Sequence, residues 1–390
     1  MRTLIAGLTT RAIAESAVGA GFDVVTVDYF GDLDQKRLCP NVSLREGGRP
    51  YSAGALLALA ANVLAEAVVY VGGLENHPEV VARLARGRRL LGNEPETLAR
   101  VRDPAAVFAF LHRHGFETPT TFTRGRLAEQ GLPVNGRWLV KPAAAGGGQG
   151  IRAWRGGLPG PGRILQERLS GTAGSISFVA DGRASVLLGS SEQLAGRGGF
   201  RYGGNLVPLA DAPVLWEELR ALASALTAEY GLVGLNGVDF VVRVGRGGGA
   251  PRPVVLEVNP RYSASMELVE QTLGVSLFGL HVAGCQGDLA PARRIEVRAV
   301  EPGVRGKWIV YAPATVEVAR SSEWIGRGVR DVPRPGDVIR RGQPICTVLA
   351  SAPSRAECLR RLQKEGAFLL QQCARRPSSA RTILLSLIHI

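Results

Sequence analysis

The strongest constraint on this 390-residue chain is a pair of apolar segments that each carry one carboxylate. Asp239 lies in LNGVDFVVRV, Glu257 lies in PVVLEVNP, and a stretch rich in glycine and proline separates them. Segments of this kind predict two paired strands joined by a hairpin. Glu257 and Asn259 are two residues apart, so their side chains share one face of a strand. A carboxylate within an apolar strand is costly unless it is neutralised, which favours a cation site over a salt-bridged edge strand.

If Asp239 lies on that same face, three oxygen donors converge, as is typical of a Mg²⁺ (or Mn²⁺) ion that bridges the phosphates of ATP. Arg261 follows two residues after Asn259 in the sequence EVNPR. An arginine at this place can stabilise a transferred phosphoryl group or an acyl phosphate. The segment therefore predicts phosphoryl-transfer chemistry.

A second motif places a lysine directly before a glycine-rich loop. The apolar run Leu139-Val140 leads to Lys141, and the loop AAAGGGQGI follows. Glycines let backbone N–H groups approach phosphate closely, and the lysine supplies a point charge. The segment is not a Walker A motif, because GxxxxGK[ST] is absent. A flexible surface hairpin is the alternative. About 25 residues later, Gln166-Glu167-Arg168 ends another apolar strand, where it either presents groups to an adenosine or is simply exposed.

The first 93 residues alternate short apolar strands with helical segments, one of them expected over residues 51–67, which predicts a parallel α/β sheet. The helical segment that follows, ETLARVRDPAAVFAFLHRHG, is expected to break at its proline, Pro104. Ligands of such sheets bind beyond the carboxyl ends of the strands. Two loops expected there carry polar residues, namely Thr9, Thr10 and Arg11 in the first and Glu75 and Asn76 in the second. The first loop opens a helix, so it indicates either an anion site or ordinary helix capping.

Lys141 with its glycine loop, the QER strand, VDF and EVNPR, in this order, resemble an ATP-grasp enzyme over roughly residues 90–300. GNEPETLARVRDPAAVFAFLHRHGFETPTTF is similar to the segment that opens the ATP-grasp region of biotin carboxylases, and the whole chain resembles a group of predicted ATP-dependent carboligases. The resemblance implies an α/β fold with a Rossmann-like pre-ATP-grasp domain (1–93), an ATP-grasp domain (94–300) with a small lid (about 105–170), and a β-rich, hammerhead-like region (301–376). Residues 377–390 match nothing before them and indicate either a disordered tail or sequence past the natural end.

The same resemblance assigns roles. Lys141 would contact ATP phosphate and, with Arg261, serve catalysis, while Asp239, Glu257 and Asn259 would hold Mg²⁺. The lid residues would be Gly146, Gly147, Gly148, Gln149 and Gly150, and the adenosine pocket would contain Gln166, Glu167 and Arg168. One departure stands out: biotin carboxylases have a nucleotide-binding lysine where this chain has Pro104, and Arg100 or Arg102 is the candidate substitute.

The implied reaction is ATP- and Mg²⁺-dependent ligation of a small carboxylate to an amine (or a thiol) through an acyl phosphate, with ADP and phosphate as products. Arg201 and Tyr202 are the side chains best placed in sequence to face the acceptor, although a surface loop is the alternative. Two other functions stay open. One is a carboxylase that uses bicarbonate and a biotin carrier supplied by a partner. The other is a non-catalytic nucleotide-binding protein.

The formal net charge of +13 is no evidence for nucleic-acid binding. Only four of the 47 basic residues are lysines, arginine is spread along the whole chain, and no nucleic-acid motif accompanies it. We expect small-molecule partners rather than nucleic acid. No apolar run reaches the roughly 18 residues of a membrane span. Five cysteines without a CxxC pair predict neither a disulfide framework nor a zinc site, and they suit the cytoplasm. A homodimer is compatible with the class.

Overall fold

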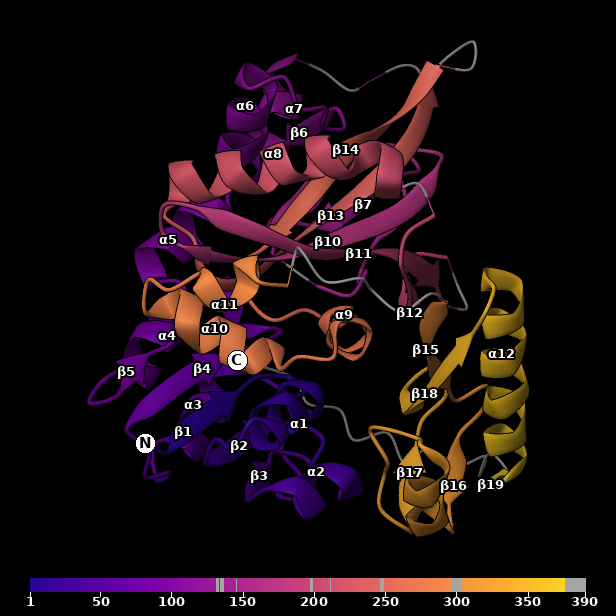
Figure 1. The fold of residues 1–390 in the computed structure, drawn as a ribbon. Helices are drawn as coiled ribbons and strands as arrows, with labels where there is room; N and C mark the ends of the chain where they lie inside the picture. Colours follow the sequence, from indigo (N-terminus) through magenta and orange to yellow (C-terminus); the bar gives the residue numbers. More distant parts are fainter. Residues whose placement is uncertain are drawn as a thin grey trace.

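The computed structural model describes residues 1–130, 133, 137–144, 146–196, 199–210, 212–245, 249–295 and 303–375. The chain builds an N-terminal parallel sheet, a long central antiparallel sheet, a small raised sheet and a C-terminal sheet (Figure 1). The mixed α/β class with a Rossmann-like N-terminal part is confirmed. In the described part of the chain, no single helix is long and apolar enough to span a membrane, and only a pair bent by 103° (Met266–Leu273 with Leu277–Cys285) meets that criterion jointly.

The N-terminal sheet has the strand order β3-β2-β1-β4-β5, and every pairing is parallel. Its strands are β1 (Thr3–Ala6), β2 (Val24–Asp28), β3 (Asn41–Ser43), β4 (Ala67–Tyr70) and β5 (Arg89–Leu90). The helical segments between them are α1 (Arg11–Gly19), α2 (Leu33–Leu38), α3 (Ala53–Ala60), η1 (Leu74–Asn76) and α4 (Pro78–Leu84). Since the strands are parallel, the loops after β1, β2 and β4 meet at one edge.

The helix expected over residues 51–67 is shorter than predicted, because α3 ends at Ala60. The guanidinium of Arg88 donates to the carbonyls of Ala60 (2.9 Å) and Val63 (2.7 Å). These bonds satisfy carbonyls that a continuing helix would have used, and the chain then turns into β4.

The central sheet has the order β14-β13-β10-β11-β12-β15-β18 and is antiparallel throughout. Its strands are β10 (Thr172–Asp181), β11 (Ser185–Ala195), β12 (Tyr202–Val207), β13 (Val233–Gly245), β14 (Gly249–Asn259), β15 (Val304–Tyr311) and β18 (Pro344–Ala352). Helix α8 (Ala212–Tyr230) covers one face, while α9 (Met266–Leu273), α10 (Leu277–Cys285) and α11 (Ala290–Arg293) cover the other (Figure 1). Alternating residues of β10 divide accordingly, since Phe178 packs with α8 and Val179 with α10.

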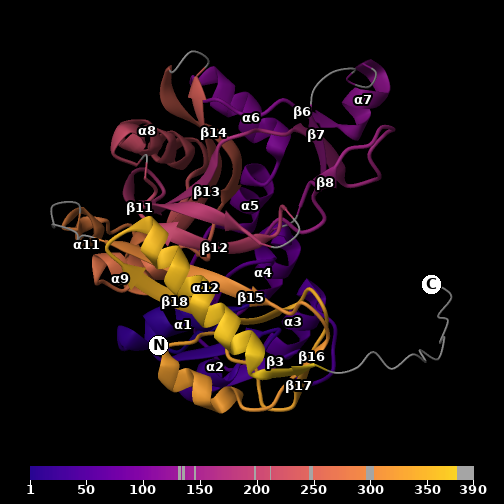
Figure 2. The ribbon, with the colours of Figure 1, turned by 90° about the vertical axis from the view of Figure 1, so that its right-hand side faces the viewer.

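The small sheet has the order β6-β9-β7-β8 and stands apart from the N-terminal sheet (Figure 2). It consists of β6 (Thr121–Thr123), β7 (Trp138–Pro142), β8 (Arg152–Ala153) and β9 (Arg163–Glu167), with helix α7 (Arg124–Gln130). Two helices lead to it, α5 (Pro95–Val101) and α6 (Pro104–Arg113), divided at the proline where the sequence predicts a break.

The C-terminal segment contributes to two sheets. Strands β15 and β18 extend the central sheet across the boundary predicted at residue 300. The remaining elements are β16 (Val316–Val318), η2 (Ser321–Arg327), β17 (Asp337–Ile339), α12 (Arg355–Gln371) and β19 (Cys373–Arg375). Helix α12 packs along β15 and β18 (Figures 1 and 2). The predicted tail, 377–390, lies outside the described residues.

A buried histidine joins three parts of the fold. The Nδ1 atom of His281 in α10 accepts a hydrogen bond from the backbone N–H of Leu235 (2.9 Å), and its Nε2 lies 3.0 Å from the carbonyl oxygen of Leu91. The acceptor role of Nδ1 requires a neutral ring with its proton on Nε2. Burial lowers the pKa of His281 from 6.5 to about 4.

Acid is therefore expected to destabilise the protein through His281. A histidine pKa lowered by folding adds stability above pH 6.5, and this stability is lost as the pH falls toward 4, by about 3 kcal/mol. Urea unfolding at pH 7.5, 6, 5 and 4.5 measures the slope. In the His281→Gln variant the slope should be correspondingly shallower, and an unchanged slope would exclude the buried imidazole as its source.

Candidate active site

The two predicted carboxylates lie directly opposite each other. Asp239 on β13 pairs with Glu257 on β14, next to a bulge that follows Asp239. Gln193 on β11 donates its Nε2–H to Asp239 Oδ1 (2.8 Å). Burial, followed by the neighbouring charge of Glu257, raises the pKa of Asp239 to about 7. A cation bound beside Asp239 would therefore stabilise its charged form.

The donor set at this pair suits a hard cation. Asn259, which is 5% exposed, is close enough to hydrogen-bond Asp239, and its Oδ1 accepts a hydrogen bond from Arg261 Nη2 (3.3 Å). Oxygen ligands of this kind are the ones Mg²⁺ takes in proteins. Within the described ranges there is no group of three or more His, Cys, Asp or Glu side chains arranged to hold a metal. The candidate site therefore consists of two carboxylates and one amide.

Lys141, at the end of β7, lies in a narrow cleft with Arg102 and Glu257. Burial lowers the pKa of Lys141 and the charge of Arg102 acts in the same direction, whereas Glu257 and Asp239 oppose them. The lysine accordingly faces the carboxylate pair, as the motif order predicts. Apolar side chains form the rest of the cleft, including Val101, Val107 and Phe108.

Of the two arginines considered in place of the missing lysine, Arg102 is the one in the cleft. Its Nε donates to Asn76 Oδ1 (2.9 Å), and its Nη1 donates to the carbonyl of Val258 (2.8 Å) and lies 4.0 Å from Glu257 Oε2. Asn76 thus orients this arginine.

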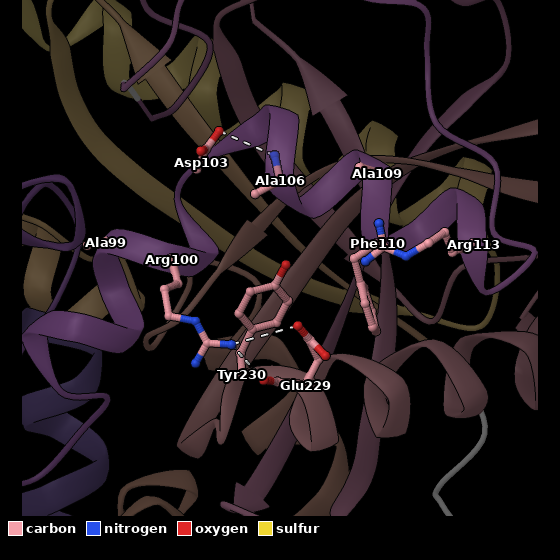
Figure 3. A pocket seen from close by; sticks show the side chains of 9 residues that line it. All are labelled: Ala99, Arg100, Asp103, Ala106, Ala109, Phe110, Arg113, Glu229 and Tyr230. Atoms are coloured by element: carbon pink, nitrogen blue, oxygen red, sulfur yellow. Dashed lines mark hydrogen bonds and ion pairs between the residues drawn. The ribbon is translucent and has the colours of Figure 1, made fainter.

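Arg100 points elsewhere. It donates to the Glu229 carbonyl (3.0 Å) and lies over the Tyr230 ring, 5.3 Å from its centroid. These residues line a separate surface pocket of about 480 Å³ (Figure 3). Arg100, in the last turn of α5, and Arg102, at its C-terminal end, therefore face different cavities.

Arg261 is held by a carboxylate from the N-terminal part of the chain. Its Nη2 lies 2.7 Å from Glu75 Oε1 and donates to Asn259 Oδ1 (3.3 Å), while Nη1 donates to the carbonyl of Tyr262 (3.0 Å). Glu75 is 1% exposed and accepts a further hydrogen bond from Gly73 N–H (2.6 Å). Burial disfavours its charged form, but the arginines Arg261 and Arg102 outweigh this and leave its pKa lowered. Glu75 is thus committed to orienting Arg261.

The glycine loop lies over this ion pair. A Cβ on Gly146 would stand 3.9 Å from Arg261 Nη2 and 4.0 Å from Glu75 Oε1. Gly148 has φ +71°, and a Cβ there would lie 1.7 Å from the carbonyl oxygen of Phe200, so only glycine fits. Tyr202 N–H donates to the Gly147 carbonyl (3.1 Å). The loop is docked on the 199–202 segment.

The three residues predicted for the adenosine pocket, together with Gln149 of the loop, make contacts within the small subdomain or to that segment. Gln166 donates to Thr121 Oγ1 (3.1 Å), and Glu167 accepts from the N–H and hydroxyl of Thr120 (3.3 and 3.2 Å). Arg168 lies over the Phe200 ring at 5.6 Å, and Gln149 N–H bonds to the Gly146 carbonyl (3.3 Å). These bonds connect β9 with the strand and loop beside it.

The first N-terminal loop is occupied by internal contacts. Thr10 donates to Asp28 Oδ2 (2.9 Å), and Thr9 is exposed. Arg11 is 3% exposed: its Nε bonds to Asp331 Oδ1 (2.9 Å), and its Nη1 bonds to Glu267. Its guanidinium is therefore engaged by carboxylates far away in sequence.

Arg201 and Tyr202 also contact the C-terminal segment. Arg201 donates to the Gly342 carbonyl and lies over the Tyr311 ring, 5.3 Å from its centroid. The Tyr311 hydroxyl donates to the Tyr202 carbonyl (2.7 Å), and Tyr202 bonds to Asn205 through its hydroxyl. These bonds fix the segment that receives the glycine loop.

One buried ionic cluster was not predicted from the sequence. Lys307 Nζ lies 2.6 Å from Glu267 Oε2 and donates to the Ala264 carbonyl (3.2 Å), and Glu267 also bonds to Arg11. The one available signal was that Lys307 is among only four lysines in an arginine-rich chain. The cluster joins α1, α9 and β15.

Residues 101–265 match the family model described as the ATP-grasp domain. This part of the chain is therefore similar to ATP-grasp domains. That range holds Lys141, the glycine loop, the carboxylate pair and Arg261. An uncharacterized protein of Methanocaldococcus jannaschii is 21% identical over 373 residues, which is 90% of this chain and 88% of that one. The carbamoyl phosphate synthase large chain of Myxococcus xanthus is 24% identical over 236 residues, which is 54% of this chain but only 21% of that protein.

Solved structures extend the likeness beyond the ATP-grasp domain. The biotin carboxylase domain of Hydrogenobacter thermophilus 2-oxoglutarate carboxylase, solved with MgADP and bicarbonate, has a TM-score of 0.69 at 17% identity and covers 93% of this chain and 88% of its own. Rhizobium etli pyruvate carboxylase has a TM-score of 0.70 at 18% identity, and the match covers 93% of this chain and 37% of that one. Campylobacter jejuni biotin carboxylase has a TM-score of 0.66 at 15% identity, and the match covers 95% of this chain and 94% of that one. The domains around the ATP-grasp domain thus share this fold.

Proposed function

We propose that the chain is an ATP- and Mg²⁺-dependent ligase that joins a small carboxylate to an amine or a thiol through an acyl phosphate. The observation that carries the proposal is the convergence of Lys141, the Asp239–Glu257 pair and Arg261 next to the docked glycine loop. No enzyme nucleophile is needed for this chemistry. The half-buried Cys285 beside the buried His281 fits that view, since burial raises the pKa of the thiol to about 12.

In this proposal Asp239, Glu257 and Asn259 hold Mg²⁺, which neutralises the phosphate charge of bound ATP. Lys141 binds a phosphate oxygen as a point charge, and it is half-buried, so little water competes for it. Arg102 completes the cationic wall of the cleft where related enzymes use a lysine. The chain's contribution is positioning and charge stabilisation.

The bond changes follow from these positions. An oxygen of the carboxylate substrate attacks the γ-phosphorus, the bond to ADP breaks, and the acyl phosphate forms. The amine then attacks the acyl carbon, phosphate leaves, and the amine loses a proton. Arg261 stabilises the charge of the transferred group, because Glu75 and Asn259 hold its guanidinium in one orientation. The glycine loop above it excludes water that would hydrolyse the intermediate.

A bicarbonate-using carboxylase is the second candidate, and the likeness to biotin carboxylase domains favours it. Bicarbonate is itself a carboxylate that ATP can activate, so the same residues would serve. The two candidates differ in their acceptor. We also propose a homodimer, by analogy with the 2-oxoglutarate carboxylase domain, which was solved as a dimer. Light scattering of the purified chain tests this.

Release of ADP from ATP tests the activity. Amino acids, dicarboxylates and bicarbonate are offered one at a time, each with and without an amine. A ligase should release ADP only with a matching acid and show full turnover only with an acceptor. Stimulation by bicarbonate alone would favour the carboxylase. Binding of MgATP without turnover under any condition would argue for a non-catalytic protein.

A further inference from the structure

Two buried polar atoms beside the ion pair of Arg261 and Glu75 lack hydrogen-bond partners among the described residues. They are the hydroxyl oxygen of Tyr51 and the Nε of Arg261. Both flank the turn after β4. A Cβ on Gly73 would lie 2.0 Å from the Tyr51 hydroxyl, and a Cβ on Gly72 would lie 4.0 Å from Arg261 Nε. The two orphan groups therefore lie beside adjacent residues of one turn.

Both groups act as donors. The other nitrogens of Arg261 are used by Glu75, Asn259 and the Tyr262 carbonyl, which leaves the Nε–H free. The Tyr51 phenol keeps its proton at neutral pH, because burial and the nearby Glu75 raise its pKa to about 12 against the effect of Arg261. A buried donor without a partner costs about 1–3 kcal/mol. Two such donors at one turn indicate a missing acceptor.

Tyr51 is held firmly in this place. It directly precedes α3, whose N-cap Ser52 accepts a hydrogen bond from Ala55 N–H (3.1 Å). Its ring packs edge-on against Tyr29, with 6.2 Å between centroids. The Glu75 carboxylate does not take up the free donors, since it is bonded to Arg261 Nη2 and to Gly73 N–H. An outside acceptor would thus find both donors in fixed positions.

We propose that Tyr51 contacts the substrate: its O–H and the Nε–H of Arg261 together bind a carboxylate group. The inference deepens the proposed function and rests on it for the identity of that group as the acid to be activated. A carboxylate fits because it accepts hydrogen bonds only and gains charge-assisted bonds from an arginine. A Cβ added to Gly146 of the docked loop would lie 3.9 Å from Arg261 Nη2, so the loop stands beside the bound group.

The Tyr51→Phe variant tests this proposal, with Tyr29→Phe as a matched control that removes a hydroxyl from the neighbouring ring. The purified full chain is titrated with acetate and with succinate by saturation-transfer NMR, with and without MgADP. We expect Tyr51→Phe to weaken binding of at least one probe by about 10-fold or more, the range of a hydrogen bond to a charged group. Its melting temperature should stay the same or rise, because the lost hydroxyl had no partner. Tyr29→Phe should bind like the wild type.

Equal binding by Tyr51→Phe and the wild type would overturn the proposal, and so would a wild-type chain that binds neither probe. A marked drop in the melting temperature of Tyr51→Phe would also overturn it, because the hydroxyl would then have a structural partner. The titration without nucleotide separates the proposed role of Tyr51 from the proposed ligase function. If MgADP fails to bind, the proposed ligase function falls, while the carboxylate titration still decides the role of Tyr51.

Discussion

Replacing Glu267 by glutamine is expected to lower the free energy of unfolding by about 3–5 kcal/mol, the range for breaking a buried ion pair. The Glu267 side chain is 6% exposed and neutralises both Arg11 and Lys307. Arg11 keeps Asp331 when the charge is removed, but among the described residues Lys307 keeps just one direct contact, the Ala264 carbonyl. The buried ammonium would then have no directly paired carboxylate, and Asp331 would act on it only at longer range. Urea unfolding at pH 7.5 measures the loss.

Two further variants show whether the cause is electrostatic. Glu365→Gln breaks an exposed pair with Arg327 (3.1 Å) and should cost at most about 1 kcal/mol. The double variant Glu267→Gln/Lys307→Met removes the orphaned charge and should recover part of the stability. A loss below about 1 kcal/mol in Glu267→Gln, or no recovery in the double variant, would mean that the cluster does not stabilise the fold as described.

Replacing Lys141 by alanine is expected to reduce kcat/KM for ATP-dependent turnover by about 100- to 1000-fold, the range for removing one preorganised charge donor at a reacting phosphate. Lys141 is half-buried and faces Glu257 and Asp239, so no water can replace its charge at equal strength. Coupled ADP-release kinetics measure the change once a substrate is known. Unfolding in urea should show a folded protein.

Lys364→Ala is the matched control, because this lysine is exposed on α12. Its turnover should equal that of the wild type. Lys141→Arg should not restore activity, because a planar guanidinium differs in shape and reach from an ammonium group. Full turnover in Lys141→Ala would remove the lysine from the phosphate site.

Local pattern was enough to predict the strands that carry the candidate metal ligands. Two apolar segments joined by a glycine- and proline-rich stretch predict a hairpin, and the structure pairs Asp239 with Glu257 across it. The helix break at Pro104 follows equally from the proline itself. The helix over 51–67 was predicted too long because its end depends on Arg88, which lies 28 residues from Ala60 and reaches its carbonyl only in the folded chain.

Contacts between segments far apart in the chain could not be predicted from the sequence. Thr10 and Arg11 stand where a helix N-terminus could bind an anion, but Asp331, 320 residues away, already engages the arginine. Glu75, which the loop position predicted to lie near substrate, pairs with Arg261, a partner that no sequence pattern indicated. In each case the residue type and the loop position correctly predicted that the side chain makes polar contacts. The partner depends on tertiary packing, which no local pattern contains.

The most direct test of the central claim, that Asp239, Glu257 and Asn259 hold the metal of a bound nucleotide, is a calorimetric titration of the chain with ATP. It compares the wild type and Glu257→Gln, each with excess Mg²⁺ and with EDTA. We predict that EDTA weakens binding to the wild type by at least 10-fold and that Glu257→Gln binds weakly under both conditions while remaining folded. Equal ATP affinity in all four titrations would contradict the account.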